Sequence, residues 1–136
     1  MLSISPDGRI VAGIWNFDGF YWTKKSGTVK ISKLPNGLPS SRTYPNAIAA
    51  GGKVIFGGSG DPFSSVPTAF VWTAAEGMKA LQPIISAHGI VIPAGYTLTD
   101  VLASSADGTG LLWLAYDPSF RQVSFVLRLP VSAYGL

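Results

Sequence analysis

Hydrophobic residues come in short runs along this chain, and turn residues separate the runs in a recurring order. An Asp-Gly-like turn followed by an apolar run stands at residues 6–13 (PDGRIVAG), 50–57 (AGGKVIFG) and 106–113 (ADGTGLLW). A second apolar string follows each of these, at residues 19–23 (GFYWT), 69–73 (AFVWT) and 124–128 (SFVLR). The turns lie 44 and 56 residues apart and the second strings 50 and 55, so both patterns keep their order. Such spacing is typical of repeats of about 40–50 residues that each form one small sheet.

Each repeat is predicted to be a four-stranded antiparallel meander. Asp-Gly and Gly-Gly pairs supply the positive φ angles of tight hairpin turns. In the second repeat, Phe70 and Trp72 alternate with Val71, so both faces of that strand are apolar. A sheet that is apolar on both faces packs between neighbouring sheets. We expect a single repeat domain over residues 1–136, with units at about 1–35, 44–83 and 97–136 and loop linkers at 36–43 and 84–96.

The predicted fold class is all-β, with about three propeller-type four-stranded antiparallel blades that form a partial or oligomer-completed β-propeller. The alternative is a β-sandwich whose turns look alike. We expect about ten to twelve short strands and at most one or two helical turns, with one of them within Pro83–His88. The side chains expected to be buried between sheets are Val11, Phe20, Trp22, Ile55, Phe70, Trp72, Leu112 and Phe125.

Composition also favours many short strands over long helices. Charged residues make up 12% of the 136 residues, against roughly 25% in an average soluble domain, and 16 Gly and 10 Pro indicate frequent turns. No cysteine is present, which excludes disulfides, thiolate zinc sites and iron–sulfur clusters. The net charge of +3 comes from ten basic residues against seven acidic ones. Nucleic-acid grooves carry denser basic stripes, so we expect no nucleic-acid partner.

The ends of the predicted array need partners. Closed propellers have about four to eight blades, and this chain supplies three. We expect either self-association, with two chains joined head to tail into a six-bladed ring, or upstream blades of a longer chain. The first residues lack the basic and apolar segments of a signal peptide, so we expect none in this chain. No apolar run approaches the roughly 18 residues of a spanning helix, so we expect no membrane insertion.

Two stretches of the chain resemble a known repeat. Residues 5–13 (SPDGRIVAG) and 69–79 (AFVWTAAEGMK) resemble the HAF-type repeats of bacterial extracellular proteins, which read roughly A-x-S-A-D-G-S-V-V-V-G and A-F-R-W-T-x-x-x-G-M. The stretch from residue 87 to 108 is similar to the last repeat of such arrays. Residues 5–9 (SPDGR) also resemble the repeats of TolB-like periplasmic propellers. The resemblance implies an extracellular, cell-surface or periplasmic location and supplies no catalytic set.

The chain departs from the HAF-type pattern at two places. The second repeat has Gly51 where the pattern has Asp, and the third has Leu127 where it has Trp. The resemblance nevertheless covers nearly the whole chain, and the second unit carries it best.

Candidate catalytic residues are few. The single histidine, His88, has no Asp, Glu or second His within ten residues. Asp7 and Asp107 occupy hairpin turns, and Asp61 and Asp117 precede prolines, so all four have conformational reasons to be there. Calcium loops, phosphate loops and nucleophile elbows are absent from the sequence. We therefore expect no catalytic residue, no metal site and no cofactor.

Aromatic residues are the positive hint of a binding site. Those in the Phe-x-Trp strings are expected to pack between sheets. Four others fall in the predicted loops between second and third strands, where ligand surfaces form on rigid scaffolds: Trp15, Phe17, Phe63 and Phe120. They are our candidate ligand-binding residues.

Three functions are compatible with these patterns. The leading hypothesis is a non-catalytic binding or scaffold module of a bacterial secreted or surface protein, which contacts a glycan or a protein through loops at one end. The alternative is a carbohydrate-active enzyme domain, which needs two carboxylates converging on one cleft. A further alternative is a structural spacer, one fragment of a larger repeat protein.

Overall fold

The computed structural model describes residues 2–35, 41–61 and 67–136. The described part is all-β, with eleven strands in three antiparallel sheets and with 10% helix. The predictions of an all-β chain and of about ten to twelve strands are confirmed. A short α-helix, α1 (Gln82–Ala87), forms where Pro83 was expected to open one. The expected limit of two helical turns is wrong, because two 3₁₀ turns form as well, at Ala50–Gly52 and Val131–Tyr134.

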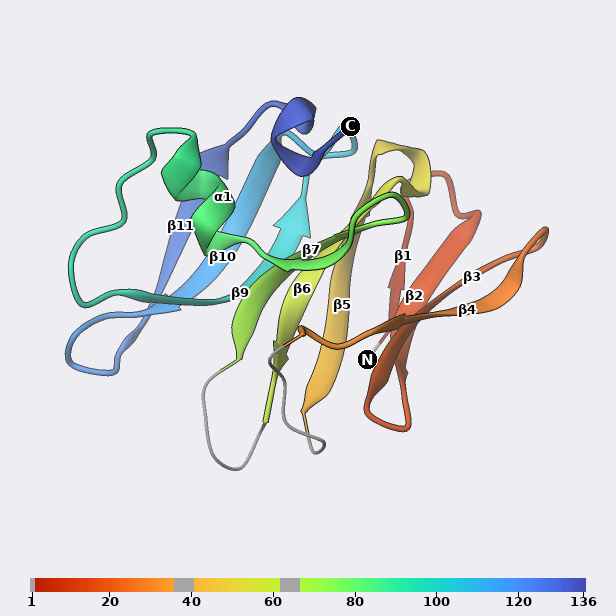
Figure 1. Ribbon diagram of the computed structural model, residues 1–136, viewed down its shortest axis with the longest axis horizontal. Coiled ribbons are helices and arrows are strands. Elements are labelled where there is room, and N and C mark those ends of the chain that lie inside the picture. Colours follow the sequence, from red (N-terminus) through yellow and green to blue (C-terminus); the bar gives the residue numbers. More distant parts are fainter. Residues whose placement is uncertain (1, 36–40, 62–66) are drawn as a thin grey trace.

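Each sheet is a meander in which consecutive strands pair (Figure 1). The first sheet contains β1 (Leu2–Ile4), β2 (Ile10–Trp15), β3 (Asp18–Thr23) and β4 (Gly27–Ser32). The second contains β5 (Arg42–Ala49), β6 (Val54–Gly60), β7 (Thr68–Thr73) and β8 (Gly77–Ala80), with the 3₁₀ turn η1 (Ala50–Gly52) between β5 and β6. The third contains β9 (Thr97–Ser104), β10 (Gly110–Tyr116) and β11 (Gln122–Arg128), and the 3₁₀ turn η2 (Val131–Tyr134) follows it.

The turns before β2 and β10 are built by the same side chains in the same way. The Ser5 hydroxyl donates to Asp7 Oδ1 at 2.6 Å and accepts from the amide of Ile10 at 3.0 Å. The Ser105 hydroxyl donates to Asp107 Oδ1 at 2.6 Å and accepts from the amide of Gly110 at 2.9 Å. Gly8 and Gly108 complete these turns with φ angles of 72° and 84°, which glycine adopts at little cost. A Ser-x-Asp-Gly sequence thus specifies one hairpin geometry at two distant places.

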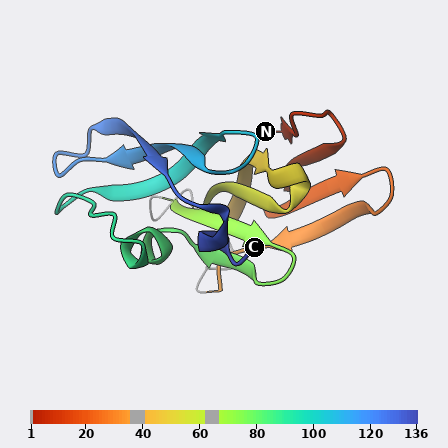
Figure 2. The ribbon, with the colours of Figure 1, turned by 90° about the horizontal axis from the view of Figure 1, so that it is seen from above.

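The three sheets stack face to face, with the second sheet between the other two (Figure 2). Ala12 and Ile31 of the first sheet share one apolar core with residues of the second, including Ile55 and Phe70. A larger core fills the space between the second and third sheets and contains Trp113. The first strand of each later sheet packs on the sheet before it: β5 contacts β1, β2 and β3, and β9 contacts β5, β6 and β7.

Glycine permits the closest approach between the second and third sheets. A Cβ atom at Gly58 of β6 would lie 2.9 Å from the carbonyl oxygen of Thr99 and 2.9 Å from the carboxyl carbon of Asp100, both in β9. The turns of these sheets are also joined, because the amide of Ala50 donates to the carbonyl of Ala106 at 2.8 Å. Backbone contacts as well as apolar side chains therefore hold β9 against the second sheet.

The prediction of four strands in every unit is wrong for the third sheet, which has three. After β11 the chain reaches Pro130, which has no amide hydrogen for a strand ladder, and then forms η2. Tyr134 of η2 is buried, and its hydroxyl donates to the carbonyl of Gly108 at 2.9 Å. The last residues thus cover the core from one end instead of extending the sheet.

The expected core is correct in the middle of the stack and wrong at its ends. Ile55 and Phe70 are fully buried. Val11, Phe20, Trp72 and Phe125 are half-buried. Trp22 and Leu112, however, are exposed to 41% and 37%. Each of these two lies on the face of its sheet that points away from the second sheet, so none of the three described sheets covers it.

Candidate functional site

In the first and third sheets, the connections between the second and third strands lie at the same end of the molecule (Figure 1). In the first sheet the connection is the turn at Asn16 and Phe17, and in the third it is the loop at residues 117–121. The corresponding loop of the second sheet contains residues 62–66, so the candidate Phe63 lies outside the described residues. This is the end of the molecule at which the sequence predicts a binding surface.

Phe17 is displayed at this end in an unusual backbone conformation. Asn16 and Phe17 both have positive φ angles, 49° and 73°, as the two central residues of a tight hairpin turn require. A bulky residue rarely adopts such an angle. Two contacts with β5 hold Phe17: its carbonyl accepts from the amide of Thr43 at 3.0 Å, and the Arg42 guanidinium lies 4.7 Å from its ring centroid. The residue nevertheless stays 48% exposed.

Trp15 is the last residue of β2 and lies in the strand, not in the loop where it was expected. Its side chain is 73% exposed. It borders a depression of about 280 Å³ on the first sheet, which Phe20 and the ion pair of Lys30 with Asp18 (2.9 Å) also line. Trp15 and Phe17 therefore belong to one hairpin, with Trp15 on the sheet and Phe17 at the tip.

Phe120 projects from the loop between β10 and β11, where it is 84% exposed and has a φ angle of 61°. Asp117 organises this loop by accepting from the amides of Ser119 and Arg121 at 2.8 and 2.9 Å. The hydrogen bond from the Arg121 amide is the main cause that lowers the pKa of Asp117. The loop of Phe120 and the hairpin of Phe17 lie on opposite sides of the second sheet (Figure 1), so the structure does not join them into one patch.

A polar site that the sequence analysis missed lies between the first strands of the three sheets. The Asn46 side-chain amide of β5 donates to Asp100 Oδ1 at 2.7 Å and to the carbonyl of Val101 at 3.1 Å, both in β9. The Ser3 hydroxyl of β1 donates to the backbone carbonyl of Asn46 at 2.9 Å. A depression of about 350 Å³ opens beside these groups and is lined by residues of β1, β5 and β9. The side-chain oxygen of Asn46 is buried without a hydrogen-bond partner.

Asp100 contributes a carboxyl group with a raised pKa to this site. Burial raises its pKa to about 7, although the hydrogen bond from Asn46 acts in the opposite direction. Its partner is an amide, whereas a glycosidase would place a second carboxylate across the cleft. The sequence contained one signal of this site, because aspartate is rare inside strands and Asp100 stands within an apolar one. Nothing in the pattern paired it with Asn46, which precedes it by 54 residues.

The other candidates carry no catalytic arrangement. His88 is exposed, and its ring nitrogen contacts the carbonyl of Ile84 at 2.9 Å. Within the described residues, no group of three or more His, Asp or Glu side chains could hold a metal ion.

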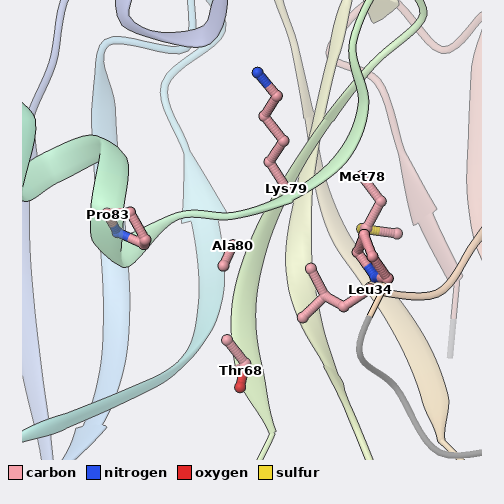
Figure 3. A pocket seen from close by; sticks show the side chains of 7 residues that line it. Leu34, Thr68, Met78, Lys79, Ala80 and Pro83 are labelled. Atoms are coloured by element: carbon pink, nitrogen blue, oxygen red, sulfur yellow. The ribbon is translucent and has the colours of Figure 1, made fainter.

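A groove of about 440 Å³ lies between the segment that follows β4, at Leu34 and Pro35, and strand β8 (Figure 3). Leu34, Met78 and Pro83 make it largely apolar, and the Lys79 side chain extends away from it. Lys79 forms an ion pair with Glu76 at 2.9 Å. The described side chains that line the groove include no acid and no histidine, so they offer packing surface and no acid–base group.

The chain matches no protein-family model and no curated protein. In the part that the structure describes, no helix is long and apolar enough to cross a membrane.

Proposed function

We propose that this chain is a non-catalytic binding or scaffold module, built from propeller-type blades, of a bacterial secreted or surface protein. It contacts a glycan or a protein through the loops at the end that carries Phe17 and Phe120. The resemblance of residues 5–13 and 69–79 to HAF-type repeats supports the extracellular location.

Three features support the blade-type architecture. The sheets are meanders of three or four strands, they stack face to face, and the first strands of consecutive sheets are in contact. The turns at Asp7 and Asp107 share their hydrogen bonds, as repeats of one unit should. A sandwich would place two sheets face to face, whereas here a central sheet is covered on both sides.

The observation that carries the binding function is the display of Phe17. The Arg42 guanidinium lies 4.7 Å from the centre of its ring, its backbone has a positive φ angle of 73°, and the residue is still 48% exposed. Strain of this kind costs about 1–3 kcal/mol and is concentrated at functional sites. A fixed aromatic face beside a cationic group is suited to stack on a sugar ring or to hold a side chain of a partner protein.

A panel of immobilised oligosaccharides tests the proposal in its glycan form. We expect the wild-type chain to bind some members, and Phe17→Ala or Phe120→Ala to weaken that binding by tenfold or more. Val91→Ala is the matched control, because Val91 is exposed and apolar but lies in the connection between α1 and β9. Binding that neither loop variant changes would contradict the proposed surface, and binding to no member would contradict a glycan ligand.

A further inference from the structure

Corresponding positions of the three sheets can be counted from the turns before their second strands. The same position is occupied by Val11, Ile55 and Leu111, and the next one by Ala12, Phe56 and Leu112. Successive strand residues point to opposite faces, so the first set marks one face of each sheet and the second set marks the other. We call these the upstream and the downstream face. Within the chain, each downstream face packs on the upstream face of the following sheet.

The downstream face of the third sheet is bare. Ala12 and Phe56 are fully buried at their position, whereas Leu112 is 37% exposed. On the neighbouring strands Val71, opposite Phe56, is 2% exposed, and Val126, opposite Leu112, is 73% exposed. At these two positions the side chains are apolar, as in the covered sheet, but no sheet of the described chain packs against them. Ser124 and Arg128 alternate with Val126 along β11 and share its face, so the apolar part of this face is centred on Leu112 and Val126.

The upstream face of the first sheet is bare in the same way. Ile48 of β5 is 4% exposed, and Ile4, at the corresponding position of β1, is 63% exposed. Trp72 of β7 is half-buried against the first sheet, and Trp22, at the corresponding position of β3, is 41% exposed. An exposed apolar face that repeats the composition of a buried one marks an association site.

We propose that two copies of this chain associate head to tail, with the upstream face of the first sheet of each copy on the downstream face of the third sheet of the other. The inference rests on the blade-type stacking proposed above and is independent of any ligand. A second copy is the partner that the faces themselves specify, because each bare face is of the type that already packs on the other within the chain. Two such contacts close a ring of six sheets, within the about four to eight of closed propellers.

One contact between the copies follows from the contacts inside the chain. Tyr21, on the downstream face of the first sheet, packs on Trp72 with ring centroids 5.2 Å apart. Val126 corresponds to Tyr21, and Trp22 corresponds to Trp72. Trp22 of one copy should therefore pack on Val126 of the other. Lys30, on the same face as Phe20 and Trp22, does not oppose this contact, since it is paired with Asp18 at 2.9 Å.

In the proposed ring of six sheets, Trp15 belongs to the contact between copies, whereas Phe17 belongs to the ligand-binding surface. Trp15 follows Val11 and Gly13 on the upstream face, so the partner copy would cover it. Phe17 and Phe120 lie in the connections between strands and remain available to a ligand. Failure of the association and failure of ligand binding are thus separable.

Molar mass in solution is the first test, by sedimentation or light scattering. We expect twice the 14.3 kDa of the chain for the wild type and for the control Val91→Lys. We expect loss of the dimer in Val126→Lys at concentrations where the wild type is dimeric. Circular dichroism shows whether that variant keeps its sheets. Trp22→Ser is a second variant if it does not.

A thiol-specific cross-link tests the head-to-tail geometry, because the chain has no cysteine of its own. Stacked sheets lie about 10 Å apart, beyond the roughly 7 Å Cα–Cα reach of a disulfide, so a short bismaleimide is the reagent. We expect a covalent dimer when Trp22→Cys and Val126→Cys variants are mixed, and none from either variant alone.

Three results would overturn the proposal. A monomer at every concentration tested would show that a second copy does not cover the faces. Efficient cross-linking of Trp22→Cys or Val126→Cys with itself would show a face-to-face pair instead of a head-to-tail one. A mass well above two chains would show a larger ring or an open filament.

Discussion

Asp100 and Asp107 are both aspartates of the third sheet, and their surroundings move their pKa values in opposite directions. Asp107 is exposed and accepts hydrogen bonds from the Ser105 hydroxyl at 2.6 Å and from the amide and hydroxyl of Thr109 at 3.0 and 2.8 Å. These bonds favour the ionised form and lower its pKa to about 2. Asp100 is largely withdrawn from water, which raises its pKa to about 7. The carboxylate of Asp107 stabilises its turn, whereas the burial of Asp100 in β9 disfavours its ionised form.

Asp107 should therefore titrate at an unusually low pH. We expect its carboxyl ¹³C shift to have a midpoint near 2. The stability that these hydrogen bonds contribute is present above pH about 4 and is lost as the pH falls through 2, since the folded-state pKa is the lower one. Ser105→Ala removes the largest cause and should move the midpoint back towards the ordinary value of 3.8. An unchanged midpoint in that variant would contradict the assignment of the cause.

Asp100 should make the protein less stable as the pH rises. Its folded-state pKa of about 7 exceeds the ordinary 3.8, so the folded form holds the proton more tightly. The stability is complete below pH about 4, falls between about 4 and 7, and is level above that. Asp100→Asn keeps an acceptor for Asn46 and removes the charge. We expect the variant to gain on the order of 4 kcal/mol over the wild type at pH 8 and nothing at pH 4.

Urea unfolding at the two pH values measures this difference. Asp18→Asn is the control, because Asp18 lies at the surface in an ion pair with Lys30. An equal effect of Asp100→Asn at pH 4 and pH 8 would show that the carboxyl group does not titrate in this range.

Strands β3 and β7 have the same sequence pattern and different surroundings. Phe20 and Trp22 of β3 lie on a bare face, whereas Phe70 and Trp72 of β7 pack on the first sheet. The difference arises from the order of the sheets and not from the strands themselves.

A tryptophan deletion in each strand measures that difference. We expect Trp72→Ala to cost on the order of 3–5 kcal/mol of unfolding free energy, because it leaves a cavity beside Tyr21 and Phe70. Trp22→Ala should cost about 1 kcal/mol when measured at concentrations too low for association. A loss below about 1 kcal/mol for Trp72→Ala would mean that β7 does not pack where we place it.

The strands and turns could be predicted from the sequence because their determinants are local. Ser-x-Asp-Gly specifies a hairpin through bonds within five residues, and alternation of Phe70, Val71 and Trp72 specifies which residues share a face. Whether another sheet covers a given face, in contrast, is not determined by residues near that face in the sequence. Nothing near Trp22 or Leu112 in the sequence indicates whether a further sheet follows, so both were assigned to the core.

The candidate site was predictable to the same limited degree. That Phe17 and Phe120 would lie in connections between strands followed from the turn residues around them. The separation of their two loops across the second sheet depends on how sheets stack. The hydrogen bond between Asn46 and Asp100 forms because β5 and β9 of different sheets lie side by side. The residue pattern within either strand does not indicate which strand of another sheet it will contact.

The stack as a whole has a protected centre and two open sides. The second sheet is covered on both faces, and its strands β6 and β7 contain residues such as Val54, Phe56 and Phe70 that are fully buried. Strands at the ends have one face in water, and Leu2 and Val126 are exposed to 70% and 73%. Local opening requires less free energy where fewer apolar contacts are lost.

Hydrogen exchange at low protein concentration should follow this order. We expect the slowest amide exchange in β6 and β7 and faster exchange in β1 and β11, because the strands at the ends open without disturbing the central core. Uniform exchange rates across all three sheets would show that the sheets unfold as one unit.

The short third sheet has a further consequence. Its outer strand, β11, has backbone donors and acceptors along one side with no fourth strand to bond them. The outer strands β4 and β8 carry Lys30 and Lys79, charges that discourage pairing with other molecules, whereas β11 has no charged residue before Arg128 at its end. A seven-residue, β-rich edge whose one charge stands at its last position can recruit identical strands from other chains into cross-β stacks. If heat or acid loosens the third sheet, amyloid-like growth should therefore begin at β11, and its residues should form the fibre core that resists protease digestion.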